Sequence, residues 1–292
     1  MSKGIQDLNG KLAVVTGAAS GIGRALSIGL AAKGCNLALV DMDQAGLEAL
    51  KAQIEGVQVT THIADVGDRE RMKVLADQVA AAHDGIHLLI NNAGIGYEAA
   101  FPQTSLEAWD KVMGVNLWGV IHGCHFFMPH LAKVPRAHIV NLSSLFGVIG
   151  MAGQTAYCTS KFAVRGLSES LWEELRDTNI GLTVVHPGGV ATNIMKRSEG
   201  DDPELLKRIS SWFERNAIPP ERAAAQIIGA IQSGKPRLMI TKEAVFGDLV
   251  KRVFPVFGNK LMGDAVIKSI GLEDMRAKRL IQWKETMVDP CD

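Results

Sequence analysis

From residue 11 onward the chain repeats one pattern, in which a short apolar run is followed by a turn and then by a longer segment of helical period. The candidate strands are residues 11–17, 36–41, 57–65, 87–92, 137–144, 181–187 and 237–240. The candidate helices lie near residues 22–33, 43–55, 68–83, 105–131, 155–178 and 220–233. Strands that are apolar on both faces suit a sheet covered by helices on both sides. The alternation predicts an α/β protein with a doubly wound parallel sheet of seven strands and helices on both faces.

Helix-start patterns support these boundaries. Asp68 is expected to cap the third helix, Thr104 and Glu107 to form a capping box, and Pro219-Pro220 to open the sixth helix. Two segments depart from the alternation: residues 188–218 and everything after about residue 241. We therefore expect a single domain over residues 1–240 that includes the segment 188–218. An extension over 241–292 is expected to pack on the pocket or on a subunit interface.

Composition excludes several classes of protein. Lysine plus arginine and aspartate plus glutamate each total 31, so the formal net charge is zero and no nucleic-acid partner is indicated. The four cysteines form no close CxxC pair, and the first residues lack the apolar core of a signal peptide. These features predict a cytoplasmic protein with free thiols. No apolar run is long enough to predict a transmembrane segment.

The first turn after a strand is rich in glycine. The sequence TGAASGIG contains Gly17, Gly21 and Gly23 in the spacing GxxxGxG. Glycines between a strand and a helix let the backbone approach a pyrophosphate, whose charge is stabilised at the helix N-terminus. The alternative is a glycine-rich turn without a ligand, but the position between a strand and a helix favours a dinucleotide site.

An acidic residue, Asp41, ends the next strand. A carboxylate at this position can bond both ribose hydroxyls and repels a 2′-phosphate, so it favours NAD over NADP. Ser20 and Met42 stand where a basic residue would serve a 2′-phosphate. Arg24 is the nearby cation that could change this preference.

The stretch QTAYCTSK places Tyr157 and Lys161 four residues apart on a predicted helix. Alone, the pair is weak evidence, because a Tyr and a Lys four residues apart are more often two unrelated residues on one helix face. Phenols ionise near pH 10, so Tyr157 could act as a base only if its pKa were lowered. Lys161 lies one turn further along the same face, where its ammonium could stabilise a phenolate.

With these motifs in order, the chain resembles the short-chain dehydrogenase/reductase family over roughly residues 8–240. The matching motifs are TGAASGIG (16–23), Asp65-Val66, NNAG (91–94), Asn116, NLSS (141–144), the Tyr157/Lys161 pair and PGGVAT (187–192). The resemblance implies a Rossmann fold and an NAD cofactor. The cofactor-binding residues it implies, together with those of the first turn and Asp41, are Gly17, Ser20, Gly21, Ile22, Gly23, Asp41, Asp65, Val66, Asn92, Ala93, Gly94, Tyr157, Lys161, Pro187, Gly188, Val190 and Thr192.

The resemblance also implies a catalytic set. Tyr157 is expected to be the general acid/base, with Lys161 also holding the nicotinamide ribose. Ser144 is expected to orient the substrate oxygen, and Asn116 to hold a water that connects the lysine to solvent. Ser143 is the alternative serine. Because side chains alternate along a strand, the two serines should face opposite ways.

Other reactive residues fit structural roles better. His122, Cys124, His125 and His130 match no standard zinc spacing, so no metal site is predicted. Cys158 follows the tyrosine directly, and its side chain should leave the helix on another face.

The leading hypothesis is an oxidoreductase that transfers a hydride between a secondary alcohol or ketone and NAD. An NADPH-dependent ketoreductase and a non-catalytic dinucleotide sensor are the alternatives. A membrane-surface or scaffold protein is a third, because residues 244–270 mix apolar and basic positions. Pro255, Gly258 and Gly263 interrupt that segment, which favours a buried tail.

The resemblance also implies that residues 188–218 form a substrate loop beside the nicotinamide. Apolar residues in this loop and in the turn at 144–153 predict an apolar alcohol or ketone. The substrate-binding candidates are Ser144, Phe146, Met151, Tyr157, Met195 and Trp212, with Leu145 and Ile149 in the same turn. We also expect a homotetramer or homodimer. The helices near 105–131 and 155–178 would form its contact through Trp118, Phe126, Phe127, Leu171 and Trp172.

Overall fold

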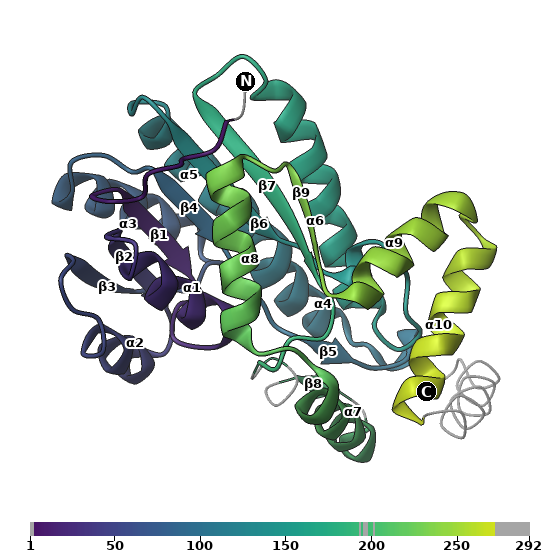
Figure 1. The fold of residues 1–292 in the computed structure, drawn as a ribbon. Helices are drawn as coiled ribbons and strands as arrows, with labels where there is room; N and C mark the ends of the chain where they lie inside the picture. The colour runs from purple at the N-terminus through teal and green to yellow at the C-terminus, as the bar shows by residue number, and fades with distance from the viewer. Residues whose placement is uncertain (1–2, 193, 195–197, 201, 272–292) are drawn as a thin grey trace.

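The computed structural model describes residues 3–192, 194, 198–200 and 202–271 (Figure 1). Seven parallel strands form one sheet in the order β3-β2-β1-β4-β6-β7-β9. The strands are β1 (Leu12–Thr16), β2 (Asn36–Asp41), β3 (Val59–Ile63), β4 (Leu88–Asn91), β6 (Ala137–Leu142), β7 (Ile180–Pro187) and β9 (Arg237–Ile240). The predicted doubly wound sheet is confirmed, with ends that differ from the predicted bounds by up to two residues.

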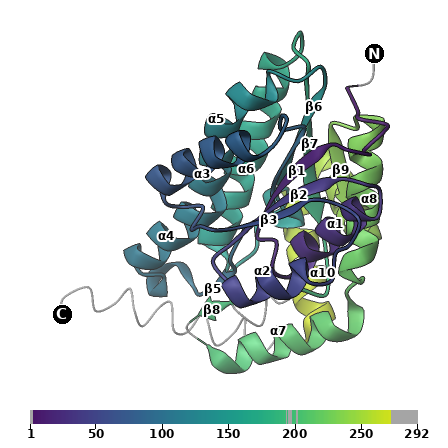
Figure 2. The same ribbon diagram turned by 90° about the vertical axis from the view of Figure 1, so that its left-hand side faces the viewer.

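Helices cover both faces of the sheet, as Figure 2 shows edge-on. One face packs against α1 (Gly21–Ala31), α2 (Gln44–Lys51) and α8 (Pro220–Ser233). The other packs against α3 (Arg69–Ala82), α5 (Gly119–Leu131) and α6 (Thr155–Glu174). The strand order reverses between β1 and β4, which pair with each other at the centre of the sheet. In doubly wound sheets ligands bind at such a reversal, beyond the carboxyl ends of the strands.

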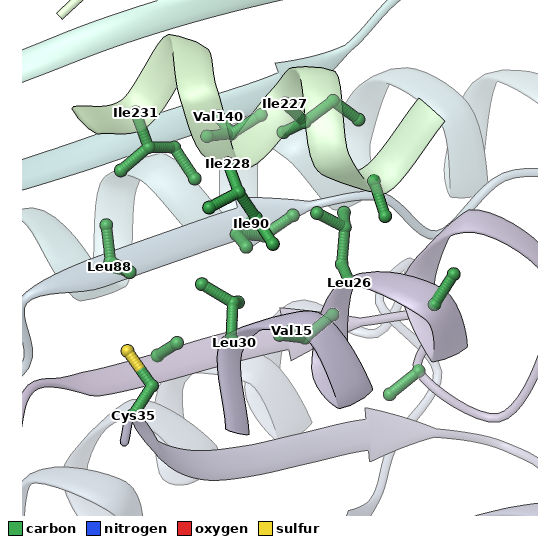
Figure 3. Packing of buried hydrophobic residues seen from close by; sticks show 14 of the residues in the cluster. Val15, Leu26, Leu30, Cys35, Leu88, Ile90, Val140, Ile227, Ile228 and Ile231 are labelled. Atoms are coloured by element: carbon green, nitrogen blue, oxygen red, sulfur yellow. The ribbon is translucent and has the colours of Figure 1, made fainter. Parts of the chain in front are cut away.

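The core on the α1 side lies between two helices and the central strands. Leu26 and Leu30 of α1 meet Ile227, Ile228 and Ile231 of α8 over the strands (Figure 3). A Cβ on Gly29 would lie 2.8 Å from the Ile228 Cδ1 atom, so the absence of a side chain there lets α1 and α8 approach closely. Full burial of each such leucine or isoleucine contributes roughly 1.5–3 kcal/mol.

The helix predicted over 105–131 is interrupted. It consists of α4 (Leu106–Met113), a π-helical turn (Gly114–Trp118) and α5. Its predicted cap is wrong: the Ser105 side chain accepts from the Ala108 N–H at 3.2 Å, whereas the Thr104 hydroxyl donates to the Ala100 carbonyl at 3.0 Å. Thr104 bonds back to the preceding 3₁₀ turn (Phe101–Gln103), which leaves the capping position to its neighbour. The other two predicted helix starts agree with the structure. The Asp68 side chain caps α3 by accepting from the Arg71 N–H at 2.9 Å. Pro219 and Pro220 begin α8.

The two segments outside the alternation have structure of their own. Between β7 and α8 lie a short strand β8 (Glu199–Gly200), paired with β5 (Tyr97–Glu98), and the helix α7 (Pro203–Asn216). After β9 come α9 (Lys242–Val253) and α10 (Phe257–Ile270), which break at Pro255. Gly258 and Gly263 lie inside α10 and do not interrupt it. The α9–α10 pair packs on a 3₁₀ turn (Leu145–Gly147) through an apolar cluster that includes Met262 and Ile149.

The expected subunit contact is partly wrong. Phe127 has no exposed surface and belongs to the core between α5 and the sheet. Trp118 and Trp172 are 47% and 44% exposed, while Phe126 and Leu171 are half-buried. None of the helices in the described part of the chain combines the length and the apolarity that crossing a bilayer requires.

Candidate active site

The glycine-rich turn between β1 and α1 forms one wall of the cavity at the reversal of the sheet. Gly17 and Gly21 have φ values of 65° and 54°, which disfavour any residue with a side chain. A Cβ on Gly17 would lie 2.9 Å from the Ala93 Cα, and one on Gly21 would lie 3.1 Å from the Thr192 side chain. Gly23 does not line the cavity. A Cβ there would meet the Gly17 carbonyl at 2.2 Å, so Gly23 allows the helix to pack against the turn.

A hydrogen-bond network joins this turn to β4. The Asn92 side-chain amide donates to the Thr16 and Gly17 carbonyls at 2.9 and 3.2 Å. The Thr16 hydroxyl accepts from the Asn92 and Ala93 N–H groups at 3.0 and 3.1 Å. These bonds fix the loops after the two central strands on either side of the reversal. Thr16 stands inside the TGAASGIG motif, yet this bridging role was not predicted for it.

Two acids stand at the far end of the same wall. The Asp41 carboxylate accepts from the Ala19 N–H at 2.9 Å and from the Asp43 N–H at 3.0 Å. Asp65 accepts from the Gly67 N–H at 2.8 Å. Met42 also lines the cavity, whereas Arg24 is bonded to the Gln53 side chain and lies outside the lining. A carboxylate held by two backbone donors is a fixed acceptor that faces the cavity.

Tyr157 and Lys161 lie one turn apart at the start of α6. The Lys161 Nζ atom is 5.7 Å from the centre of the Tyr157 ring and donates to the Leu142 carbonyl at 3.0 Å. Ser144, just beyond β6, is hydrogen-bonded to the Tyr157 phenol and accepts from the Phe146 N–H at 3.1 Å. Ser143 also borders the cavity, but its hydroxyl donates to the Lys161 carbonyl at 2.8 Å. Ser144 is therefore the serine whose side chain bonds the tyrosine.

Asn116 lies behind this wall, in the π-helical turn. Its side chain accepts from the Ile95 N–H at 2.8 Å and donates to the Ile95 carbonyl at 3.0 Å and the Ser160 hydroxyl at 3.1 Å. A Cβ on Gly94 would lie 3.2 Å from the Asn116 Oδ1 and 3.4 Å from the Lys161 Nζ. The glycine thus allows the asparagine and the lysine to approach each other. The water that Asn116 was expected to hold stays a prediction.

Burial shifts the pKa values of Tyr157 and Lys161. Burial raises the pKa of Tyr157 to about 12, although the Ser144 hydrogen bond opposes that shift. Burial also lowers the pKa of Lys161 to about 8. The direction of the Tyr157 pKa shift is opposite to the one expected from a neighbouring ammonium, because burial disfavours the charged phenolate. Within the protein alone the phenol is neutral at pH 7, so a further positive charge is needed to lower its pKa.

One continuous cavity of about 1140 Å³ unites these groups. That volume exceeds the roughly 300–1,000 Å³ of ordinary ligand sites, which leaves room for two ligands. The predicted residues that line it are Gly17, Ser20, Gly21, Ile22, Asp41, Asp65, Val66, Asn92, Ala93, Gly94, Ser144, Phe146, Met151, Tyr157, Lys161, Pro187, Gly188, Val190, Thr192 and Trp212. Gly23 and Asn116 lie behind the wall, and Met195 lies outside the described residues. Ile149 is buried in the cluster under α9 and α10.

Comparison with known proteins identifies the family. The family model described as short chain dehydrogenase matches residues 11–203. The chain belongs to this family. Putative oxidoreductase SadH of Mycobacterium tuberculosis is 37% identical to this short-chain dehydrogenase over 270 residues, which are 90% of this chain and 98% of the relative. D-threitol dehydrogenase of Mycolicibacterium smegmatis is 34% identical over 223 residues, or 75% and 85% of the two chains.

Solved structures agree with this assignment. A short-chain dehydrogenase/reductase from Burkholderia phymatum in complex with NAD superposes with a TM-score of 0.77 at 29% identity. That match covers 85% of this short-chain dehydrogenase and 95% of the other chain. Levodione reductase superposes with a TM-score of 0.72 at 27% identity, over 80% and 95% of the two chains. The chain is therefore an oxidoreductase of the short-chain dehydrogenase family with a dinucleotide-binding fold.

One side of the cavity in this short-chain dehydrogenase was not predicted residue by residue. Phe101 follows β5, Ile209 lies on α7, and Val266, Ile267 and Ile270 lie on α10; all five line the cavity. The last four stand beyond the residues that the family model matches. The spacing of the three α10 residues indicates an amphipathic helix, but not the surface on which that helix packs.

The histidines and cysteines have structural partners. His122 hydrogen-bonds the Val66 carbonyl at 2.9 Å through Nδ1, and His130 lies 3.5 Å from Asp77. Burial raises the pKa of Cys124 to about 12 and that of Cys158 to about 11, so both remain thiols. Across the ranges described, no group of three or more His, Cys, Asp or Glu side chains is arranged to hold a metal ion.

Proposed function

We propose that this short-chain dehydrogenase transfers a hydride between a secondary alcohol or ketone and NAD, with Tyr157 as the general acid/base. The observation on which this rests is that Ser144, Tyr157 and Lys161 meet at one point of the cavity wall. In oxidation, the phenolate removes the hydroxyl proton while the carbon's hydrogen departs with its electron pair. Ser144 holds the alcohol oxygen, and Lys161 supplies positive charge beside the ring. NAD, when bound, accepts the hydride and contributes the positive charge of its ring.

The geometry of the cofactor side fits a dinucleotide. Gly17 and Gly21 leave the space that a side chain would fill, and the N-terminus of α1 opens beside them. Asp41 would accept from ribose hydroxyls, and Asp65 and Val66 would border the adenine. Pro187, Gly188, Val190 and Thr192 would meet the nicotinamide end.

NAD is proposed over NADP because of the charge at the ribose position. A fixed Asp41 carboxylate would repel a 2′-phosphate, and Arg24 is bonded elsewhere. The alternative is an NADPH-dependent ketoreductase. It finds some support in the relatives, since a 3-oxoacyl-[acyl-carrier-protein] reductase of Thermotoga maritima is 35% identical over 192 residues. A non-catalytic sensor is disfavoured because the chain retains all four expected catalytic residues.

The proposed substrate is an apolar alcohol or ketone. Phe146, Met151 and Trp212 line the cavity, together with apolar residues of α7 and α10. The Phe146 ring centre lies 6.5 Å from that of Tyr157. Among the described residues that line the cavity, Lys161 carries the only positive charge. On the described part of the lining, an anionic substrate would therefore find no cation beyond the catalytic one.

A screen of secondary alcohols and ketones tests this proposal, with NAD and NADP compared side by side. We expect reduction or oxidation of an apolar member with NAD or NADH as the better cofactor. Absence of turnover across the screen, with NAD binding intact, would favour the sensor. Better efficiency with NADPH would favour the ketoreductase.

We further propose a homodimer or homotetramer that buries the exposed Trp118 and Trp172. Sedimentation velocity at micromolar concentration should show a species larger than one chain, and Trp172→Ser should shift it toward the monomer. A monomer in the unaltered protein would contradict this proposal.

A further inference from the structure

The α9–α10 pair presents an unusual concentration of apolar surface to solvent. Among the described residues, seventeen large apolar side chains are strongly exposed, and eight of these lie between residues 245 and 261. We call these eight the apolar face; they are Val245, Phe246, Leu249, Val253, Phe254, Val256, Phe257 and Leu261. Large exposed apolar patches mark binding surfaces, whereas scattered single residues do not.

The apolar face is continuous rather than scattered. Val245, Leu249 and Val253 follow one another at four-residue spacing along α9, as one stripe of a helix does. At the turn between the helices the Phe254 and Phe257 rings pack edge to face, with centroids 6.5 Å apart. Val256, at this turn, is 85% exposed, the highest value among these side chains. The stripe therefore runs along α9 and over the turn onto the first turns of α10.

The opposite side of the α9–α10 pair packs against the rest of the protein. The Asn259 side chain accepts from the Gly150 N–H at 2.9 Å and donates to the Gly150 carbonyl at 3.2 Å. Met262 and Ala244 are buried against the turn that follows Ser144. Figure 1 shows α9 and α10 at the margin of the molecule, beyond β9. Because these contacts hold the inner side, the outward orientation of the apolar face is fixed by the fold.

Near the turn between α9 and α10 the charges are of one sign. Between residues 249 and 263 the sequence has three cations, Lys251, Arg252 and Lys260, and no acid. Arg252 lies 3.2 Å from Asp248, but that carboxylate already accepts two bonds of 2.7 Å from Arg237, so its charge is balanced without Arg252. Lys260 is exposed. A basic rim around an apolar surface is complementary to an anionic lipid surface.

A second copy of the chain suits this surface less well. In a two-fold contact each patch meets its own copy, so the cations near the turn would be brought toward identical cations. A lipid surface presents anionic headgroups at the rim and acyl chains beneath the apolar residues. We propose that the apolar face docks this enzyme peripherally on an anionic lipid bilayer.

Docking by the apolar face would bring the bilayer close to the cavity, because α10 takes part in both. Val266, Ile267 and Ile270, on the cavity side of α10, belong to the helix whose first turns would enter the bilayer. An apolar substrate dissolved in the lipid would then meet the enzyme close to its cavity. The docking itself does not depend on the proposed reaction.

Flotation of the full chain with vesicles tests docking without any turnover. We expect the protein to float with phosphatidylcholine vesicles that contain phosphatidylglycerol, and far less with phosphatidylcholine alone or in high salt. Phe254→Ser with Phe257→Ser should weaken vesicle binding by about tenfold or more, because apolar area no longer leaves water. Lys260→Glu should weaken it by at least roughly fivefold. Val74→Ser, which alters an exposed apolar residue on α3, should have no effect.

Thermal unfolding shows whether the paired phenylalanine variant is folded, and Lys260→Glu keeps the test available if it is not. No flotation with the anionic vesicles would overturn the proposal. Flotation that is equal in the unaltered protein and in folded variants would also overturn it. A third contrary result is sedimentation in which the phenylalanine substitutions dissociate a dimer while vesicle binding is absent; the apolar face would then be a contact between copies.

Discussion

At the proposed cofactor end of the cavity the wall consists of backbone and short polar side chains, whereas at the proposed substrate end it consists of long apolar side chains. Gly17, Asn92 and Asp41 are held by hydrogen bonds to neighbouring strand ends. Ile209, Trp212 and Ile267 come instead from helices α7 and α10, which lie outside the sheet. Hydrogen bonds and glycine conformations restrict residue type at each position, while apolar packing accepts many residues of similar volume. The first end is thus suited to one ligand, and the second can change with the substrate.

The largest loss of activity is expected at Tyr157, where the two ends of the cavity meet. Tyr157→Phe retains the ring but removes the group that exchanges the proton, so turnover should fall by roughly 10²–10⁴-fold. The affinity for NAD, measured by calorimetry, should change little. Tyr97→Phe is the matched control, since it removes the chain's other phenol, which also lines the cavity. Near-normal turnover in folded Tyr157→Phe would mean that a group other than Tyr157 exchanges the proton.

At the cofactor end, Asp41→Ala should reduce the preference for NAD over NADP. Loss of the carboxylate removes both an acceptor for the ribose and the repulsion of a 2′-phosphate. The ratio of kcat/KM for the two cofactors should shift by about tenfold or more, a change of about 1.4 kcal/mol. Met42→Ala, at an exposed neighbour on the same wall, should leave the ratio unchanged. An unaltered ratio in Asp41→Ala would show that other residues select the cofactor.

At the substrate end, Ile267→Ala should change the kinetics with the alcohol but not the binding of NAD. Removal of its outer carbons takes apolar area from the cavity wall, so KM for an apolar alcohol should rise by roughly five- to tenfold. Affinity for NAD should not change, because the cofactor wall is formed by other elements. Lys268→Ala, at an exposed position on the same helix, is the control. A fall in NAD affinity in Ile267→Ala would break the proposed division between the two ends.

The same contrast explains what could be predicted from the sequence. The strands, the glycine turn and the Tyr157/Lys161 pair were predictable because local rules restrict them: apolar runs, left-handed glycines and helical spacing. The capping residue of α4 was not, because the choice between Thr104 and Ser105 depends on a turn formed by neighbouring residues. The burial of Phe127 and the partners of α10 depend on tertiary packing, which one sequence does not encode at any single position.

The π-helical turn at Asn116 was likewise invisible in the helical pattern of residues 105–131. In this turn the Asn116 side chain pairs with the Ile95 backbone, which lies 21 positions away and is not apparent from the local pattern. Lys161 was expected to lower the pKa of Tyr157. The Lys161 Nζ lies 5.7 Å from the centre of the ring, and burial of the phenol dominates its pKa.

The central claim is that Tyr157 becomes a base only when Lys161 and bound NAD add positive charge to its buried site. The direct measurement is kcat/KM for the alcohol against pH at saturating NAD, because this quantity reports the enzyme–NAD complex. Activity should rise with pH as the phenol loses its proton, through an apparent pKa below the value of about 10 for a free phenol. In Lys161→Met the rise should move to higher pH. A rise only above pH 10 in the unaltered enzyme, or no shift in Lys161→Met, would contradict the account.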